Sequence, residues 1–351
     1  MKTSHIKSDI KEIANNLGNE VIGLSGKTVM ITGGQGFLGR YFTEVFDYLN
    51  KNLLDKSCNL IVLDNHITSG PLGAKFRDRA NIQFVEHDII KPLEWDTKLD
   101  FVVHAAGIAS PYYYRAHPMK TLEVATIGTK NMLNLANKYG ARFTFFSSSE
   151  IYGDPDPKHI PIQESYRGNV SVAGPRACYD ESKRLGETLC YVYHNMYGTS
   201  TNTIRPFNVF GPGMQESDYR ALPNFAAKIK AGKPLSIYSS GNQTRTFCYI
   251  TDAITGFILV MLKGVPGEAY NIGNPDPEIS MLDLIKRMEK VISHRIDYKT
   301  IEYPDSYPAD EPLRRCPDIR KASLQLNYKP KVNLDEGLRR FLNWTDQEYG
   351  G

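Results

Sequence analysis

Two side chains four positions apart give the sequence its clearest chemical signal. Tyr179 and Lys183 form a Tyr-x-x-x-Lys pattern near the start of a predicted helix, and this spacing places both side chains on one helix face. An ammonium group beside a phenol favours the phenolate, so the pattern predicts a lowered pKa for Tyr179. A phenolate can act as a general base toward a substrate hydroxyl. The pattern is common by chance, so its meaning depends on residues elsewhere in the chain.

A hydroxyl-rich segment lies about thirty residues upstream of Tyr179. Residues 147–150 read Ser-Ser-Ser-Glu and follow an apolar run directly. In an open parallel sheet, ligands bind at the carboxyl ends of the strands, which is where this segment falls. Ser148 and Glu150 are therefore candidate site residues.

A glycine-rich loop follows the first apolar run of the chain. Gly33, Gly36 and Gly39 are three residues apart, with Phe37 and Leu38 between the last two. The first two glycines allow the backbone to approach a pyrophosphate, and Gly39 lets the following helix pack close to the sheet. The N-terminus of that helix presents N–H groups to the phosphates. The loop predicts a bound dinucleotide; a plain strand-to-helix turn is the alternative.

An acidic residue ends the second apolar run. Asp64 can accept hydrogen bonds from the adenosine ribose and repel a 2′-phosphate, which favours NAD over NADP; the alternative is a strand-end Asp that caps its loop. Asp88, after the third run, could accept from the adenine amino group. His104 ends the fourth run and is expected to be structural. It is followed by small residues that leave room for the cofactor, Ala105, Ala106 and Gly107.

The elements that must position these residues alternate along the chain. Apolar runs predict strands at 28–31, 60–63, 82–85, 101–103 and 143–146. Helical spacing predicts helices over 8–17, 37–49, 121–139 and 182–197, and two more over 252–262 and 281–292. Buried strands separated by helices predict a parallel sheet covered on both faces, which is a doubly wound α/β fold of the Rossmann type.

The chain divides into three parts by this pattern. Residues 1–26 are interpreted as an N-terminal extension, and 27–205 as a dinucleotide-binding domain to which about 245–275 returns. After Arg205 the alternation loosens and prolines become frequent, with a Pro-rich stretch at 303–317. Residues 206–244 and 276–351 are therefore expected to form a smaller lobe that closes over a substrate.

Composition excludes several classes of protein. The chain has 351 residues, 41% of them hydrophobic, and a net charge of +3, so we expect a globular protein without a nucleic-acid partner. No apolar stretch is long enough to span a membrane, and the polar N-terminus predicts no secretory signal. Five scattered cysteines without a Cys-x-x-Cys pair argue against disulfides and a metal site, and they suit the cytoplasm.

The glycine loop, Asp64, the serine segment and the Tyr179–Lys183 pair occur in the order typical of the extended short-chain dehydrogenase/reductase family, which the chain resembles from about residue 27 to residue 349. Within that family it is most similar to the UDP-glucuronate decarboxylases. The similar stretches are 120–122 with 126–129, Ser-Glu-Ile-Tyr-Gly-Asp-Pro at 149–155, Gly-Pro-Arg-Ala-Cys-Tyr-Asp-Glu at 174–181, Gln-Thr-Arg-Thr-Phe at 243–247 and Arg-Cys-Pro-Asp-Ile at 315–319. The resemblance implies a tightly held NAD⁺, a nucleotide-sugar substrate and a homodimer.

The resemblance also implies roles for individual residues. Tyr179 would be the base and Lys183 its support, both also touching the cofactor, and Ser148 would hydrogen-bond the sugar 4-hydroxyl. Glu150 and Arg315 match positions that act near sugar carbons 5 and 6. Further residues match substrate contacts, the last of them a diphosphate ligand: Ser110, Lys120, Asn208, Tyr238 and Arg245. A surface ion pair is the alternative for Arg245, and a buried contact with the Tyr179 helix is the alternative for Glu150.

The residue before Glu150 separates two reactions. Related 4,6-dehydratases carry an Asp-Glu pair whose Asp protonates the departing 6-hydroxyl, whereas this chain has Ser149 before Glu150. Decarboxylation needs no such acid, because a ketone at C4 accepts the electrons as carbon dioxide leaves. A neutral Ser also avoids repulsion of a substrate carboxylate. We therefore expect conversion of UDP-glucuronate or a close relative, through a 4-keto intermediate, to UDP-xylose or a 4-keto-pentose.

Several positions depart from the decarboxylase pattern. They include Ile108, Arg167 and Gly213, where the family usually carries Pro, Trp and Arg. These departures leave a nucleotide-sugar 4-epimerase or 4,6-dehydratase open as the alternative enzyme. A non-catalytic dinucleotide-binding sensor is the alternative of another class, although a sensor would not need Ser148, Tyr179 and Lys183 together.

Overall fold

The largest element of the protein is a parallel sheet. The computed structural model describes residues 4–69, 78–302 and 312–350. Seven strands lie in the order β11-β6-β5-β4-β1-β2-β3, and every neighbouring pair is parallel. The strands are β1 (Thr28–Thr32), β2 (Asn59–Asp64), β3 (Ile82–Glu86), β4 (Phe101–His104), β5 (Arg142–Phe146), β6 (Thr201–Pro206) and β11 (Ala269–Ile272). The strand order reverses between β1 and β4, and in such sheets a binding crevice opens at the carboxyl ends there.

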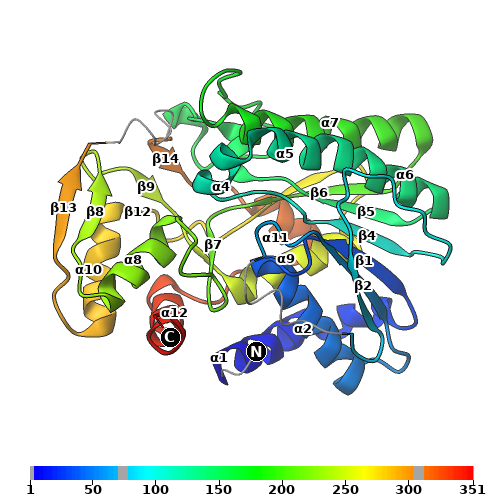
Figure 1. Ribbon diagram of the computed structural model, residues 1–351, viewed down its shortest axis with the longest axis horizontal. Coiled ribbons are helices and arrows are strands. Elements are labelled where there is room, and N and C mark those ends of the chain that lie inside the picture. The colour runs from blue at the N-terminus through cyan, green and yellow to red at the C-terminus, as the bar shows by residue number, and fades with distance from the viewer. Residues whose placement is uncertain (1–3, 70–77, 303–311, 351) are drawn as a thin grey trace.

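Helices cover both faces of this sheet (Figure 1), which confirms the predicted doubly wound α/β fold. One face carries α5 (Pro118–Glu123), α6 (Thr129–Tyr139) and α7 (Ala177–Tyr197), and the other carries α1 (Ser4–Leu17), α2 (Phe37–Asn52) and α9 (Ile250–Lys263). The alternation within β1 links the two layers. Val29 and Ile31 pack with the second group of helices and Met30 with the first, because successive side chains of a strand point to opposite faces.

The sequence predicts five of the seven strands and misses β6 and β11. The composition of β6 shows why such a strand is not found. This strand is polar in composition yet buried. Its polar groups are satisfied inside the protein: Asn202 Nδ2 donates to the Val265 carbonyl at 2.5 Å, and Arg205 pairs with Glu187 at 2.6 Å. A search for apolar runs cannot find such a strand.

The helices near the site differ slightly from expectation. The helix expected over 121–139 is divided, because a π-helical turn, η2 (Val124–Gly128), separates α5 from α6. α7 begins at Ala177 rather than at Ser182, so Tyr179 lies in its first turn. The other expected helices correspond to α1, α2, α9 and α10 (Met281–Ile292).

Most of the strands outside the main sheet lie at the left of Figure 1, beside α10. Short sheets pair β8 (Leu235–Tyr238) with β13 (Tyr298–Ile301), β7 (Val209–Phe210) with β10 (Cys248–Tyr249), and β9 (Thr244–Arg245) with both β12 (Ile279–Ser280) and β14 (Arg314–Arg315). The other helices are α4 (Pro111–Ala116), α8 (Ala221–Lys230), α11 (Arg320–Leu326) and α12 (Leu334–Glu348), with 3-10 turns η1 (Gly18–Leu24), η3 (Ser149–Tyr152) and η4 (Pro157–His159). Between the two parts of the expected lobe, the segment at about 245–275 returns to the main sheet through α9 and β11. Of the Pro-rich stretch 303–317, residues 303–311 lie outside the described residues.

The N-terminal segment packs into the core. Ile10, Ile13 and Leu17 of α1 are buried, and α1 lies against α9 and α2. Asp9 is buried with them and accepts hydrogen bonds from the hydroxyls of Tyr41 and Tyr249. Burial raises the pKa of Asp9 to about 7, although these hydrogen bonds and the nearby Arg340 oppose the shift.

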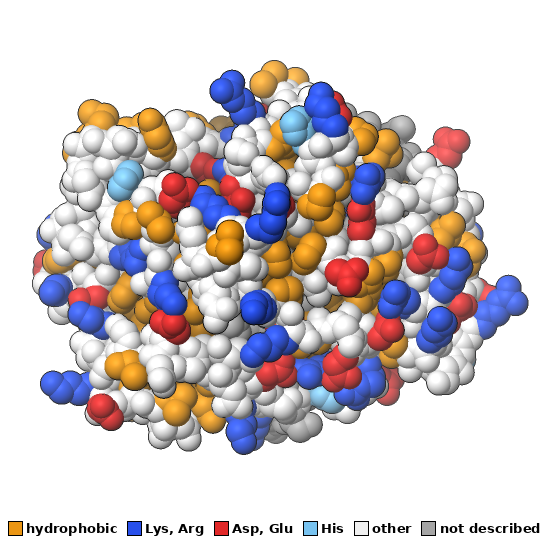
Figure 2. All heavy atoms as spheres, turned by 180° about the vertical axis from the view of Figure 1, so that it is seen from behind, with side chains coloured by type: hydrophobic (Ala, Val, Ile, Leu, Met, Phe, Trp, Pro, Cys, Tyr) orange, Lys and Arg blue, Asp and Glu red, His pale blue; other side chains and the backbone are white. Residues whose placement is uncertain are grey.

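The surface mixes charges of both signs. Figure 2 shows acidic and basic side chains interspersed with apolar ones over the face opposite to that of Figure 1. Among the described residues, no helix has both the length and the apolar character needed to cross a bilayer.

Candidate active site

Two adjoining cavities open at the carboxyl ends of the sheet strands. The smaller, of about 210 Å³, is lined by the glycine loop, the end of β2 and the segment after β4. The larger, of about 510 Å³, is lined by the serine segment after β5, the start of α7 and the smaller lobe. Residues that line both include Leu38, Ala105, Gly107 and Arg220, so the two cavities meet between them.

The glycine loop is shaped for close backbone approach. Gly33 has φ +68°, and a Cβ there would lie 2.7 Å from the Ala106 Cα. A Cβ on Gly39 would lie 2.4 Å from the Gly34 Cα, so the start of α2 can pack this tightly only with glycine. Gly36, Phe37 and Leu38 line the smaller cavity where α2 begins. These features fit a dinucleotide whose pyrophosphate lies at the N-terminus of α2.

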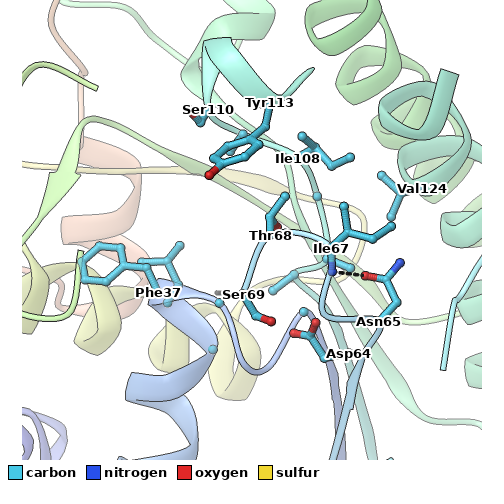
Figure 3. A pocket seen from close by; sticks show the side chains of 18 of the residues that line it. Phe37, Asp64, Asn65, Ile67, Thr68, Ser69, Ile108, Ser110, Tyr113 and Val124 are labelled. Atoms are coloured by element: carbon cyan, nitrogen blue, oxygen red, sulfur yellow. Dashed lines mark hydrogen bonds between the residues drawn. The ribbon is translucent and has the colours of Figure 1, made fainter. Parts of the chain in front are cut away.

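Asp64 caps its loops and also faces the smaller cavity, so its predicted ribose role stays a prediction. Its Oδ2 accepts from the Gln35 backbone N–H at 2.9 Å and its Oδ1 from the His66 N–H at 2.8 Å, so it caps the loops on both sides. Its side chain nevertheless lines the smaller cavity, across from Ser110 and Tyr113 of the α4 segment (Figure 3). The remaining oxygen lone pairs can serve a ribose.

Two predicted substrate contacts lie in the smaller cavity instead of the larger one. Lys120 lines it together with Asp88, and its Nζ is 4.0 Å from the Asp88 Oδ2. Ser110 lines the same cavity, and its buried Oγ has no hydrogen-bond partner within the described part of the chain. The geometry therefore groups both residues with the dinucleotide, because α4 and α5 lie over the β4 end of the sheet.

His104 is structural, as expected. It is buried, its Nε2 donates to the Val124 carbonyl at 3.3 Å, and its Nδ1 accepts from the Thr32 hydroxyl at 2.7 Å. Burial and the charge of Lys183 lower its pKa to about 3, which keeps the imidazole neutral. The Thr32 hydroxyl also accepts from the Ala106 N–H. Thr32 and His104 therefore hold in place the small residues that leave room for the cofactor.

Tyr179 and Ser148 meet in the larger cavity. Ser148 follows β5, Tyr179 lies in the first turn of α7, and the Ser148 hydroxyl acts to lower the pKa of the Tyr179 phenol. The Tyr179 ring stacks on Tyr114 with 5.4 Å between the ring centroids. This arrangement can present a phenol and a hydroxyl to one substrate hydroxyl.

The sequence predicts a lowered pKa for Tyr179, and this prediction is wrong for the protein without a cofactor. Burial raises its pKa to about 12 and outweighs the opposing effects of Ser148 and Arg220. Lys183 lies over the Tyr179 ring, with its Nζ 5.9 Å from the ring centroid, but this Nζ donates its hydrogen bond to the Phe146 carbonyl at 2.7 Å. Burial lowers the pKa of Lys183 to about 8. Its ammonium lies 3.0 Å from where a Gly107 Cβ would be, at the junction of the cavities.

Glu150 is clamped between two arginines. Arg315 donates to its two oxygens at 2.5 and 2.7 Å, and Arg176, next to the first turn of α7, also donates to it. Burial would raise the pKa of Glu150, but Arg176, Arg315 and Arg245 outweigh it and hold the pKa near 2. Glu150 therefore faces the cavity and is also held by Arg176 at the start of the Tyr179 helix, while its role near sugar carbons 5 and 6 stays a prediction. Burial and Glu150 together raise the pKa of the adjacent Asp180 to about 7.

The remaining substrate candidates line the larger cavity. Arg245 on β9 is paired in register with Arg315 on β14, so the two side chains share one face of that short sheet. Asn208 and Tyr238 line the same cavity, and the Asn208 Nδ2 donates to the Thr246 carbonyl at 2.8 Å. No group of three or more potential metal-binding side chains occurs among the described residues.

Two arginines of the site, Arg176 and Arg220, were not predicted from the sequence. Arg176 lies inside the stretch 174–181, so a basic residue beside Tyr179 was a visible signal. Arg220 lines both cavities and pairs with Asp218 at 2.5 Å. It lies in an irregular loop far from the other motifs, and nothing in its local sequence points to the site.

Comparisons with known proteins agree with this geometry. The model of the NAD dependent epimerase/dehydratase family matches residues 29–273. UDP-glucuronic acid decarboxylase 1 of Danio rerio is 37% identical over 323 residues, which cover 92% of this chain and 73% of that protein. UDP-glucuronic acid decarboxylase 6 of Arabidopsis thaliana is 38% identical over 315 residues, covering 90% and 87%. The structure of UDP-glucuronic acid 4-epimerase from Bacillus cereus, in complex with UDP-glucuronic acid and NAD, superposes with a TM-score of 0.77 and 26% identity over 92% of this chain and 100% of that one.

Proposed function

Because the chain belongs to the NAD dependent epimerase/dehydratase family, we propose that it is an NAD-dependent decarboxylase that converts UDP-glucuronate, through a 4-keto intermediate, to UDP-xylose or a 4-keto-pentose. Relatives named UDP-glucuronic acid decarboxylase, at 37–38% identity over about nine-tenths of the chain, support this choice of reaction. The smaller cavity holds the dinucleotide, and the larger one holds the nucleotide sugar.

The position of Glu150 between two arginines is the observation that favours decarboxylation over dehydration. A dehydratase needs a mobile base at C5 and an acid at the 6-hydroxyl. Here Glu150 is bound by Arg315 and Arg176, its pKa is held near 2, and its neighbour is Ser149. A carboxylate with that pKa is a weak base. The surrounding arginines instead give this end of the cavity a positive charge that suits a sugar carboxylate.

Three side chains of the larger cavity have separate roles in this reaction. Tyr179, as phenolate, takes the proton of the sugar 4-hydroxyl, and Ser148 holds that hydroxyl against it. The glycine loop and Asp64 would hold NAD⁺, which would supply a reversible acceptor for the C4 hydride and a positive charge near Tyr179. Lys183 holds its ammonium between Phe146 and the junction of the cavities. Once C4 is a ketone, the C5–C6 bond breaks and carbon dioxide leaves. The electrons of that bond form a C4–C5 enolate next to Arg315. Protonation of the enolate at C5 then gives the 4-keto-pentose.

A product assay tests this proposal directly. Purified protein is offered UDP-glucuronate and, separately, UDP-glucose, with NAD⁺ present, and the products are read by mass spectrometry. We expect carbon dioxide and a UDP-pentose or UDP-4-keto-pentose from UDP-glucuronate, and no loss of water from UDP-glucose. A 4-keto-6-deoxy sugar from UDP-glucose would identify a dehydratase, and UDP-galacturonate would identify an epimerase. Turnover of neither substrate would favour the sensor.

We also propose that the protein is a homodimer that pairs through α7. Leu185 and Met196, 49% and 69% exposed, lie on one stripe of this helix with Leu189 and Val192 between them, and Ile127 of the adjoining η2 is 47% exposed. A self-complementary patch of this kind suits a twofold contact. Sedimentation should give a dimer for the native chain and a monomer for Leu185→Asp/Met196→Asp; a monomeric native chain would refute the proposal.

We propose a reducing compartment such as the cytoplasm for this protein. All five cysteines lie within the described residues and are unpaired. Burial raises the pKa of the Cys190 and Cys248 thiols, which keeps them unreactive. Imaging of a fluorescent fusion in the source cell would test this location.

A further inference from the structure

One wall of the dinucleotide cavity comes from a distant part of the chain. Residues 211–220, here called the 211–220 loop, lie between β7 and α8. The loop contributes residues to the cavity that also contains the glycine loop and Asp64: Gln215, Ser217, Asp218 and Arg220. The cofactor would therefore be enclosed between the main sheet and this loop.

A fully buried arginine fastens the loop to the phosphate-binding segment. Arg40, on the first turn of α2, has no exposed surface. Its Nη1 donates to the Gln35 carbonyl at 2.9 Å and its Nη2 donates to the Gly213 carbonyl at 2.5 Å. Gly213 has φ +96°, a conformation that other residues rarely adopt, and the family usually carries Arg at this position. A guanidinium from α2 thus reaches a turn of the loop that requires glycine here.

Two weaker contacts fasten the loop at other points. The Gln215 Nε2 donates to the Ser69 carbonyl at 2.9 Å, beyond the end of β2. The Tyr219 ring lies 4.4 Å from the ring of Tyr112 on α4, centroid to centroid. Together with Arg40, these contacts join the loop to the segments after β1, β2 and β4, which all line the cofactor cavity.

The C-terminal end of the chain supports the same loop from its outer side. The Tyr349 hydroxyl donates to the Met214 carbonyl at 3.0 Å, and the Gly350 N–H donates to the Glu216 carboxylate at 3.1 Å. The loop is therefore held between the cofactor domain and the end of α12.

We propose that Arg40 is a positioning residue that keeps the 211–220 loop closed over the dinucleotide and thereby slows cofactor release. A hydrogen bond to a charged group that is broken inside the protein is costly, so the loop opens rarely. Slow release suits a reaction that reduces NAD⁺ and reoxidises the NADH within one cycle. That advantage rests on the proposed function, but the retention itself does not.

The test measures cofactor release without any sugar. Protein loaded with NADH is mixed with excess NAD⁺, and the loss of bound-NADH fluorescence gives the dissociation rate. Arg40→Met should raise this rate by about tenfold or more, since it removes two charge-assisted hydrogen bonds. Arg40→Lys, which keeps the positive charge but donates from a single nitrogen, should give a smaller increase; a merely structural role would not produce this partial rescue.

Two exposed positions provide a matched pair. Tyr219→Ala should raise the release rate, whereas Tyr298→Ala should leave it unchanged, because the two tyrosines are 49% and 50% exposed but Tyr298 lies on β13 away from both cavities. Should Arg40→Met fail to fold, the double variant Gln215→Ala/Tyr219→Ala decides. A wild-type release rate in a folded Arg40→Met protein, or in the double variant, would overturn the proposal. Absence of carbon dioxide from UDP-glucuronate would instead overturn only the proposed reaction.

Discussion

Replacing Glu150 by Gln should tighten the binding of UDP-glucuronate relative to UDP-glucose, and replacing Arg315 by Met should weaken it. The two ligands differ at C6, where one carries a carboxylate and the other a hydroxymethyl group. If the end of the cavity near Arg315 recognises the carboxylate, the charge of each neighbouring side chain enters the ratio of the two affinities. Effects on the nucleotide, on folding and on the cofactor are common to both ligands and cancel in that ratio.

The geometry sets the expected size of the effect. The Glu150 carboxylate lies against one edge of the Arg315 guanidinium, with N–O distances of 2.5 and 2.7 Å. An anion bound at another edge of that guanidinium would lie roughly 6 Å from Glu150, and at an effective dielectric constant of about 20 the repulsion is about 3 kcal/mol. Removing it should change the affinity ratio by about tenfold to a hundredfold in favour of the acid. Arg315→Met should move the ratio at least about tenfold the other way.

Calorimetric titration in a Tyr179→Phe background measures both affinities without turnover. Glu187→Gln is the matched control, because Glu187 forms a similar two-point pair with Arg205, at 2.9 and 2.6 Å, outside both cavities. The control should destabilise the protein but leave the ratio unchanged. Shifts of the same sign in the Glu150 and Arg315 variants, or no shift in either, would refute the assignment of the carboxylate to this cluster.

Three further outcomes are expected. Asp64→Ala should reduce the preference for NAD⁺ over NADP⁺ by about tenfold or more in calorimetry; an unchanged preference would mean that Asp64 only caps its loops. Tyr179→Phe should keep its fold and NAD⁺ binding but lose about 10²–10⁴-fold in turnover, and near wild-type turnover would remove Tyr179 as the base. Because the pKa of Asp9 is raised from 3.8 to about 7 in the folded state, its contribution to stability is complete below about pH 4 and is lost as the pH rises through about 7. The unfolding free energy of the native chain relative to Asp9→Asn should therefore fall across that range, by up to about 4 kcal/mol in denaturant titrations; a flat difference would contradict the raised pKa.

The residues that the sequence located share one property. Gly33, Asp64, Ser148 and Tyr179 each lie at the carboxyl end of a strand or in the first turn of a helix, and local sequence signals mark such positions. A parallel sheet brings all its carboxyl ends to one edge, so the order of the motifs was enough to predict that they meet.

The residues that the sequence missed depend on contacts between distant segments. Arg40 acts through Gly213, which is far away in the chain, and Arg220 reaches the cavities from an irregular loop. The sign of the Tyr179 pKa shift was missed for the same reason. Spacing on one helix predicts that Lys183 lies beside the phenol, but burial of both groups and the Phe146 carbonyl, which the ammonium contacts, are properties of the folded chain.

The 211–220 loop connects cofactor retention to the chemistry. Arg220 at its end lines both cavities, and its charge is one of the influences that lower the pKa of Tyr179 against the larger effect of burial. A loop that opened to release the cofactor would carry Arg220 away from Tyr179, so the phenol would be harder to ionise when the cofactor can leave. In the structure the loop keeps the Arg220 guanidinium beside both cavities, and Arg40 holds the Gly213 turn. The ionised fraction of Tyr179 would therefore be larger while the loop encloses the dinucleotide, so proton abstraction is favoured while the hydride acceptor is held in place.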